Sequence, residues 1–141
     1  FVGSTLLYDA QRDIASYAPY RRAIERTRDV TPPTAVIGSW DAGFNAYWLR
    51  PRRVVNLDGM VNSRKYLADV IGGRPVSEYL SSQRIEYLLN MVPDTPEARG
   101  LVESRFFRDP SIPRDCYDIL AAMPFERQSL VVYLIKYRCR R

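Results

Sequence analysis

Two short apolar runs joined by a short crossover constrain the fold of this chain more than any other feature. The run Ala35-Val36-Ile37 is followed by Gly38. The run Val54-Val55-Asn56-Leu57 is followed by Asp58-Gly59, so both are typical of buried strands that end in turns. Between them, Asp41 to Leu49 has room for about two helical turns. This order predicts a right-handed parallel βαβ unit.

The remaining elements follow from helical periodicity, β-branched runs and turn residues. Four helical segments are predicted: a leading one to about Ser16, Pro19 to Arg28, Asn62 or Ser63 to Val70, and Pro75 to Ser81. Two further strands are predicted, Ile85 to Met91 and Ser129 to Tyr137. Prolines divide the region 92–125 into helical fragments, around Glu97 to Glu103 and Cys116 to Met123. The expected fold class is α/β, a small open mostly parallel sheet (Rossmann-like) flanked by helices.

Length and hydropathy indicate one folded domain with no bilayer-spanning segment. The chain has 141 residues, of which 46% are hydrophobic and 26% charged, an ordinary globular composition. Its longest apolar runs have strand length, well short of the roughly 18 residues that a membrane helix needs.

The formal net charge is +5, and the pI is about 9.4. Most basic residues alternate with acids along the sequence, which predicts a mixed, solvated surface. The exception is a basic cluster at the end of the chain, for which we predict contact with anionic lipid: Lys136, Arg138, Arg140 and Arg141. No nucleic-acid partner is expected, because aromatic and arginine residues do not interleave on a recognisable platform.

The chain contains no histidine and two cysteines. The lack of histidine removes the usual general base and the commonest transition-metal ligand. Cys116 and Cys139 are too few for a zinc site, so they either form one disulfide in an oxidising compartment or remain free thiols. We predict no metal, no cofactor and no catalytic residue within this chain.

Polar residues follow both strands of the predicted βαβ unit. The carboxyl edge of a parallel sheet is where ligands usually bind, so these residues are the candidate ligand-binding site: Trp40, Asp41, Asn56, Asp58 and Asn62. The alternative is structural, with Asp41 capping the crossover helix and Asp58-Gly59 forming a tight turn. A nucleotide site is disfavoured, because the first loop lacks the middle glycine of a dinucleotide fingerprint.

Several segments also match a known family pattern. They are Ala35-Val36-Ile37-Gly38, Asp41-Ala42-Gly43, the region of Tyr47, and Val54 to Asn62, where Met60 replaces a leucine of the pattern; Glu78-Tyr79-Leu80 and Ile85 to Leu89 are similar too. With these features, residues 31–90 resemble the soluble C-terminal extracytoplasmic domain of GT-C-type membrane glycosyltransferases.

The resemblance implies a parent protein that transfers a sugar from a polyprenyl-phosphate donor, with its catalytic acids in membrane loops outside this chain. Residues 1–30 would be a helical lead-in from a preceding membrane segment, and residues 31–141 a single soluble α/β domain on the extracytoplasmic (periplasmic or cell-surface) side. Its implied partners are the membrane-embedded part of the same polypeptide and a lipid-linked sugar or glycan acceptor. The alternative is an independent small ligand-binding domain or enzyme that uses Asp41, Asn56 and Asp58.

Overall fold

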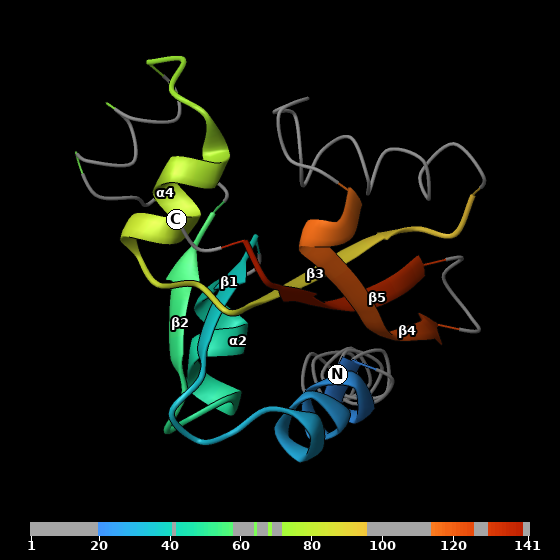
Figure 1. The fold of residues 1–141 in the computed structure, drawn as a ribbon. Helices are drawn as coiled ribbons and strands as arrows, with labels where there is room; N and C mark the ends of the chain where they lie inside the picture. The colour runs from blue at the N-terminus through green and yellow to red at the C-terminus, as the bar shows by residue number, and fades with distance from the viewer. Residues whose placement is uncertain are drawn as a thin grey trace, which may run out of the picture.

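The computed structural model describes residues 20–40, 42–57, 64, 68, 72–95, 114–125 and 130–139. Its strands form one open sheet in the order β2-β1-β3-β5-β4 (Figure 1). The strands are β1 (Val36–Ser39), β2 (Arg53–Asn56), β3 (Tyr87–Pro93), β4 (Tyr117–Phe125) and β5 (Leu130–Tyr137). The helices are residues 20–30, α2 (Ala42–Trp48), α4 (Val76–Ser82) and the short 3-10 helix η2 (Arg114–Cys116). The predicted fold class, an open α/β sheet flanked by helices, is confirmed.

The predicted parallel pairing of the βαβ unit is also confirmed, but β2 is a half-buried edge strand and not a buried one. Strand β1 pairs in parallel with β2, from Val36 opposite Arg53 to Ser39 opposite Asn56, and it pairs in parallel with β3 on its other side. The chain reaches β2 through α2 and reaches β3 after α4. These two helices pack on opposite faces of the sheet, because Phe44 of α2 and Leu80 of α4 belong to different hydrophobic clusters. The parallel half is therefore doubly wound around β1.

The second half of the sheet is antiparallel, which makes the sheet mixed. Strand β5 pairs antiparallel with both β3 and β4, and a register shift lies between Ile119 and Ala121 of β4. The helical fragment predicted for Cys116 to Met123 is therefore wrong. Its Leu-Ala-Ala-Met composition favours a helix locally, but a ladder with a strand distant in sequence overrides this weak propensity.

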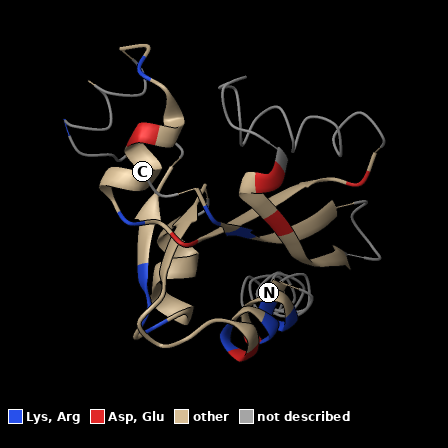
Figure 2. Ribbon diagram, viewed as in Figure 1, with Lys and Arg blue, Asp and Glu red and all other residues tan. Residues whose placement is uncertain are grey.

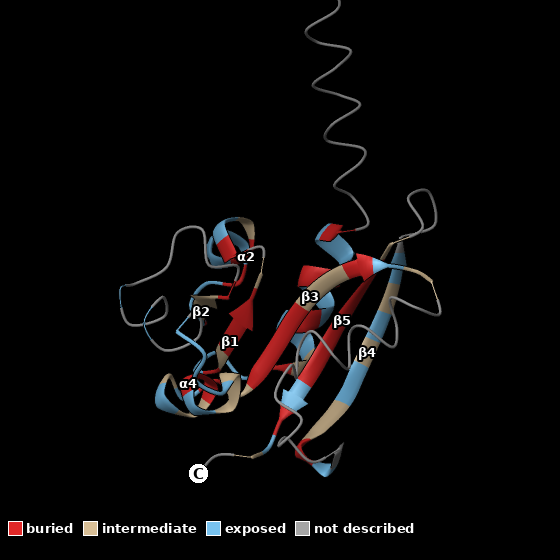
Figure 3. Ribbon diagram, turned by 90° about the horizontal axis from the view of Figure 1, so that it is seen from above, coloured by how far each residue is buried: buried red, intermediate tan, exposed pale blue. Residues whose placement is uncertain are grey.

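Each face of the sheet carries its own hydrophobic core, and the strands between them, β3 and β5, are mostly buried (Figure 3). On the α4 face, the core residues are Leu57, Tyr79, Leu80, Ile85, Leu88, Val92, Cys116, Val131, Tyr133, Ile135 and Tyr137. On the face of α2 and helix 20–30, they are Tyr20, Ala23, Ile24, Ala35, Ile37, Leu49, Tyr87, Leu89, Val132 and Leu134. Strands β3 and β5 are buried along most of their length, whereas the outer strand β4 is largely accessible. Helix 20–30 is thus part of the core on the α2 face.

Glycine 38 lies inside β1 and not in the turn that was predicted to follow Ile37. A β-carbon on Gly38 would lie 2.7 Å from Leu57 Cδ1 and 3.0 Å from Leu88 Cδ2. The missing side chain therefore lets these two leucines pack directly on the strand, and the strand continues to Ser39.

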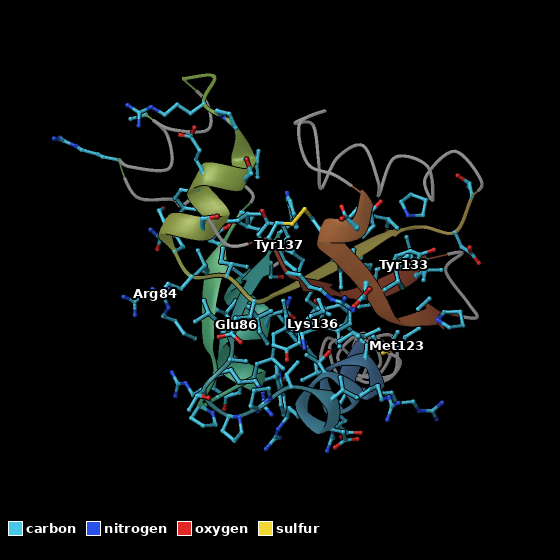
Figure 4. The ribbon with its side chains drawn as sticks, viewed as in Figure 1. Arg84, Glu86, Met123, Tyr133, Lys136 and Tyr137 are labelled. Atoms are coloured by element: carbon cyan, nitrogen blue, oxygen red, sulfur yellow. A yellow bond between two sulfur atoms is a disulfide. The ribbon has the colours of Figure 1, made fainter. Side chains whose placement is uncertain are left out.

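The two cysteines, for which both states were open from the sequence, form a disulfide (Figure 4). Cys116 lies in η2 just before β4, and Cys139 follows β5, with their Cα atoms 5.0 Å apart. The backbone N–H of Arg138 also donates to the carbonyl of Cys116 at 2.7 Å. The disulfide therefore joins the start of β4 to the end of β5, and both sulfurs are withdrawn from any metal site.

Among the described residues, no helix is long and apolar enough to cross a membrane. The predicted lead-in to about Ser16 and the helices near residues 62–70 and 97–103 lie outside the described part of the chain, apart from Arg64 and Ala68. The division of the chain at residue 30 stays a prediction.

Candidate functional site

The carboxyl edge of β1 and β2 holds the two predicted site residues that the structure describes, Trp40 and Asn56. The backbone N–H of Leu57 donates to the Ser39 carbonyl at 2.9 Å, so the parallel ladder extends to this edge. Trp40 packs against the α4-face core together with Leu57. Because side chains alternate along a strand, Asn56 lies on the opposite face, beside Ser39. The sheet therefore separates the Trp40 and Asn56 side chains.

The three other predicted site residues, Asp41, Asp58 and Asn62, lie outside the described residues. A ligand site that combines them with Asn56 stays a prediction, and so does the alternative in which they cap and turn the backbone.

Behind the β1 end of this edge, three buried side chains form a hydrogen-bonded chain. The Tyr20 hydroxyl donates to Asn45 Oδ1 at 2.7 Å, and Asn45 Nδ2 donates to Ser39 Oγ at 2.6 Å. Asn45 and Ser39 are completely buried, and Tyr20 is 5% exposed. This chain links helix 20–30, α2 and β1. We did not predict it, although an asparagine on the buried side of an otherwise apolar crossover helix is a usable signal.

These groups are suited to fixing helices and not to transferring protons. Serine, asparagine and tyrosine provide neither an acid nor a base that titrates near neutral pH without a histidine or carboxylate beside them. Within the described ranges, no group of three or more metal-ligating side chains gathers. The described part of the carboxyl edge therefore carries no catalytic constellation.

At the opposite, amino edge of the sheet, Arg52 closes the end of helix 20–30. It is 8% exposed. Its Nε donates to Thr31 Oγ1 at 2.7 Å, and its Nη2 donates to the carbonyls of Arg28 and Thr31, each at 2.6 Å. Burial lowers the pKa of Arg52, and the positive charge of Arg28 lowers it further. A guanidinium stays charged even so, and here it satisfies the last carbonyls of the helix.

Arg52→Lys is expected to lower the free energy of unfolding by about 1–2 kcal/mol, because a lysine keeps the charge but cannot contact Thr31 and Arg28 with one planar fork. The control is Arg53→Lys. Arg53 is the next residue, and its exposed guanidinium bonds the Gln83 carbonyl, so the expected loss is below about 0.5 kcal/mol. Urea midpoints of the three proteins test the difference. Equal losses in the two variants would show that the Arg52 contacts are not specific.

A group of aromatic and arginine side chains, exposed except for the half-buried Phe44, lies on the outer surface of helix 20–30, α2 and the turn after α2. We call it the aromatic–arginine face, and it consists of Arg21, Phe44, Tyr47, Trp48 and Arg50. Tyr47 is 64% exposed and Trp48 40% exposed. The Arg21 guanidinium carbon lies 5.9 Å from the Trp48 ring centroid, and that of Arg50 lies 5.7 Å from the Tyr47 ring centroid. Both distances are typical of cation–π contacts.

Aromatic packing anchors this face to the core. The centroid of the Phe44 ring lies 5.0 Å from the Tyr20 ring centroid and 6.1 Å from the Trp48 ring centroid. Because Tyr20 is buried and bonded to Asn45, the exposed rings rest on a fixed base. Tertiary packing leaves Tyr47 and Trp48 accessible.

The excess of basic over acidic residues falls in two segments that contribute to this face, residues 20–30 and 50–53 (Figure 2). Residues 20–30 and 50–53 carry seven arginines and two acidic residues. Of the chain's 21 basic and 16 acidic residues, this leaves 14 of each sign elsewhere, so the rest of the chain is neutral. The Arg52 contacts join these two segments in space. The mixed surface predicted from the sequence is therefore uneven in three dimensions.

The predicted C-terminal basic cluster is only partly described. Lys136 and Arg138 are exposed, and Arg138 forms an ion pair with Asp118 of β4. Arg140 and Arg141 lie outside the described residues. Lipid contact through this cluster stays a prediction. The sequence did not indicate that Asp118 lies beside Arg138.

The fold defines the class of this chain: an open α/β domain whose parallel half is doubly wound. No family model and no curated protein matches the chain. Among solved structures, it is similar to the 16S rRNA methyltransferase RmtF, in complex with S-adenosyl-L-homocysteine, with 13% sequence identity and a TM-score of 0.39. The match covers 92% of this chain and 65% of that one, so the chain spans less than two thirds of its neighbour. At this level of similarity, no activity carries over.

These comparisons contradict the predicted resemblance to GT-C glycosyltransferases and the function drawn from it. The similar structure is a methyltransferase, and no glycosyltransferase model or sequence matches. The assignments as a glycosyltransferase accessory domain and as part of an integral membrane protein are withdrawn. The physical reason is that the resembling stretch is a βαβ unit, whose buried strands and polar turns recur in unrelated proteins.

Proposed function

We propose that this chain is a binding domain that attaches to phosphate-bearing surfaces through its aromatic–arginine face. The observation that carries the proposal is the pairing of exposed rings with guanidinium groups, Arg21 over Trp48 and Arg50 over Tyr47. Arginine binds phosphate through parallel N–H donors, and a ring beneath the guanidinium limits its conformational freedom before binding.

The electrostatics of the region support this proposal. The surrounding segments hold an excess of arginine over acid, which attracts polyanions and speeds their association. Glu25 lies nearby, and its Oε1 accepts from Arg21 Nε at 3.1 Å. Both side chains of that pair are more than half exposed, so water and salt weaken the pair, and it engages one donor of the guanidinium.

Inorganic polyphosphate is a suitable probe, because it presents phosphate without bases or acyl chains. We expect the chain to bind it with an affinity that falls as salt rises. In Arg21→Gln/Arg50→Gln, the slope of log K against log salt concentration should decrease by about 1 for each arginine removed. Titration calorimetry across a series of salt concentrations measures this slope.

The matched control is Arg64→Gln/Arg74→Gln, which removes the same charge from exposed positions. Arg74 precedes α4, at the carboxyl edge of the sheet, whereas Arg50 follows α2, at the amino edge. The control should bind polyphosphate nearly as the unaltered chain does. If both double variants lose the same amount, only net charge matters, and the proposed face has no special role.

We also propose an extracytoplasmic location for this chain. The disulfide between Cys116 and Cys139 supports it, since such bonds form and persist in oxidising compartments. Alkylation of thiols during lysis into denaturant tests this proposal, because protein made in a reducing compartment would be labelled at both cysteines, including the buried Cys116.

A further inference from the structure

We infer that the phosphates recognised by the aromatic–arginine face are the headgroups of an anionic lipid bilayer, on which the domain docks peripherally. This inference rests on the proposed function and adds its partner. It concerns the surface of a membrane and requires no segment within it. Three features of the face favour a lipid surface over the other common polyphosphate, a single-stranded nucleic acid.

The first feature is the angle between the rings. Tyr47 and Trp48 have ring centroids 5.4 Å apart and an interplanar angle of 84°. Proteins that hold single strands stack successive bases on aromatic faces, and rings that are nearly perpendicular cannot receive two bases of one stack. The Arg21 and Arg50 guanidinium groups also occupy one side of each ring. The geometry is therefore poor for base stacking.

The second feature is the chemical character of the rings. Tryptophan and tyrosine combine an apolar body with a polar atom and collect where a membrane meets water. When the face lies on a bilayer, the Tyr47 and Trp48 rings reach the boundary of the acyl chains. The adjoining Arg21 and Arg50 guanidinium groups then remain level with the phosphates. One face then provides both the apolar and the ionic contact.

The third feature is the breadth of the positive charge. Apart from Arg53, residues 20–30 and 50–53 have five exposed arginines, four on helix 20–30 and Arg50 in the turn after α2, rather than in a narrow groove that follows one strand. A bilayer rich in anionic lipid attracts such a surface as a whole, and the attraction extends over about one Debye length. A charge distribution of this kind matches a planar polyanion.

The experiment uses vesicles of phosphatidylcholine alone and vesicles in which about one quarter of the lipid is phosphatidylglycerol. We expect the 141-residue chain to co-sediment with the anionic vesicles and to dissociate from them as salt rises. Each arginine near an anionic surface contributes about fivefold to membrane partitioning. The double variant Arg21→Gln/Arg50→Gln should therefore partition into the anionic vesicles at least tenfold more weakly. The control Arg64→Gln/Arg74→Gln should change it by less than about threefold.

Fluorescence reports whether the rings enter the interface. The chain has two tryptophans, and Trp40 packs against the α4-face core. Anionic vesicles should shift the emission to shorter wavelength in the unaltered chain, and Trp48→Phe should abolish that shift. A shift that persists in Trp48→Phe would overturn the docking geometry.

Two further outcomes would overturn the inference. In the first, the chain binds polyphosphate through Arg21 and Arg50 but does not bind anionic vesicles. The proposed function then stands, and the lipid partner is wrong. Alternatively, an unstructured oligothymidylate would bind more tightly than the vesicles and quench Trp48, which would identify a nucleic acid as the occupant. If the unaltered chain does not bind polyphosphate at all, both the proposed function and the lipid inference are wrong.

Discussion

Replacing Cys116 and Cys139 together with alanine is expected to lower the free energy of unfolding by about 3 kcal/mol. The disulfide closes a loop with a sequence separation of 23 residues, and it ties the start of β4 to the end of β5. Opening it enlarges the conformational freedom of the unfolded chain. It also releases β4, which is paired with β5 alone among the described strands. Guanidinium midpoints, converted with the m-value of each protein, measure the loss.

Reductant provides the internal control for this prediction. The unaltered chain should lose stability on reduction, whereas the double alanine variant should unfold at the same midpoint with and without reductant. Cys116 is 1% exposed, so a small part of the loss in the variant comes from the missing buried sulfur. The prediction fails if native protein contains two titratable thiols, or if reduction leaves the midpoint unchanged.

Asn45→Ala is the second substitution with a large expected effect, a loss of about 2–4 kcal/mol. The asparagine is completely buried and accepts from the Tyr20 hydroxyl while it donates to Ser39 Oγ. Alanine removes both bonds, takes a partner from each of two buried hydroxyls and leaves a small cavity between helix 20–30, α2 and β1. Denaturant midpoints and thermal scans measure the loss.

A double-mutant cycle with Tyr20→Phe separates the hydrogen bond from the cavity. We expect a coupling energy of about 1 kcal/mol between the two positions, because each single variant already breaks the same bond. Ala46→Ser, at the next and exposed position of α2, should cost less than about 0.5 kcal/mol. Additive losses for Tyr20→Phe and Asn45→Ala would contradict the network. If lipid binding also weakens in Asn45→Ala, the hydrogen bonds of Tyr20, Asn45 and Ser39 hold the aromatic–arginine face in position.

Local sequence patterns predicted the parallel half of the fold. The apolar runs before Gly38 and Asp58, with a crossover of suitable length, specify two parallel strands joined by a helix, although β2 at the sheet edge is only half-buried. Proline and glycine positions placed α4 and the end of helix 20–30 to within a few residues. The family resemblance failed on the same stretch, because a βαβ unit fixes buried strands and turns without fixing an activity.

Contacts between distant segments decided the rest. Strand β4 forms where local composition favours a helix, because β5 supplies a ladder from Tyr117 opposite Tyr137 to Phe125 opposite Leu130. The state of the cysteines was open from the sequence. Only the register of β4 on β5 brings the two Cα atoms within bonding range.

By itself, the sequence determined a basic α/β domain without histidine and with a net charge of +5. It did not determine where that charge lies in space, because arginines that are far apart along the chain can share one surface. Tertiary structure joins residues 20–30 to residues 50–53 through Arg52 and brings Arg21 over Trp48, 27 positions further along the chain. Charge acts through space and not along the sequence, so only the packing brings together the residues of the face for which we propose phosphate binding.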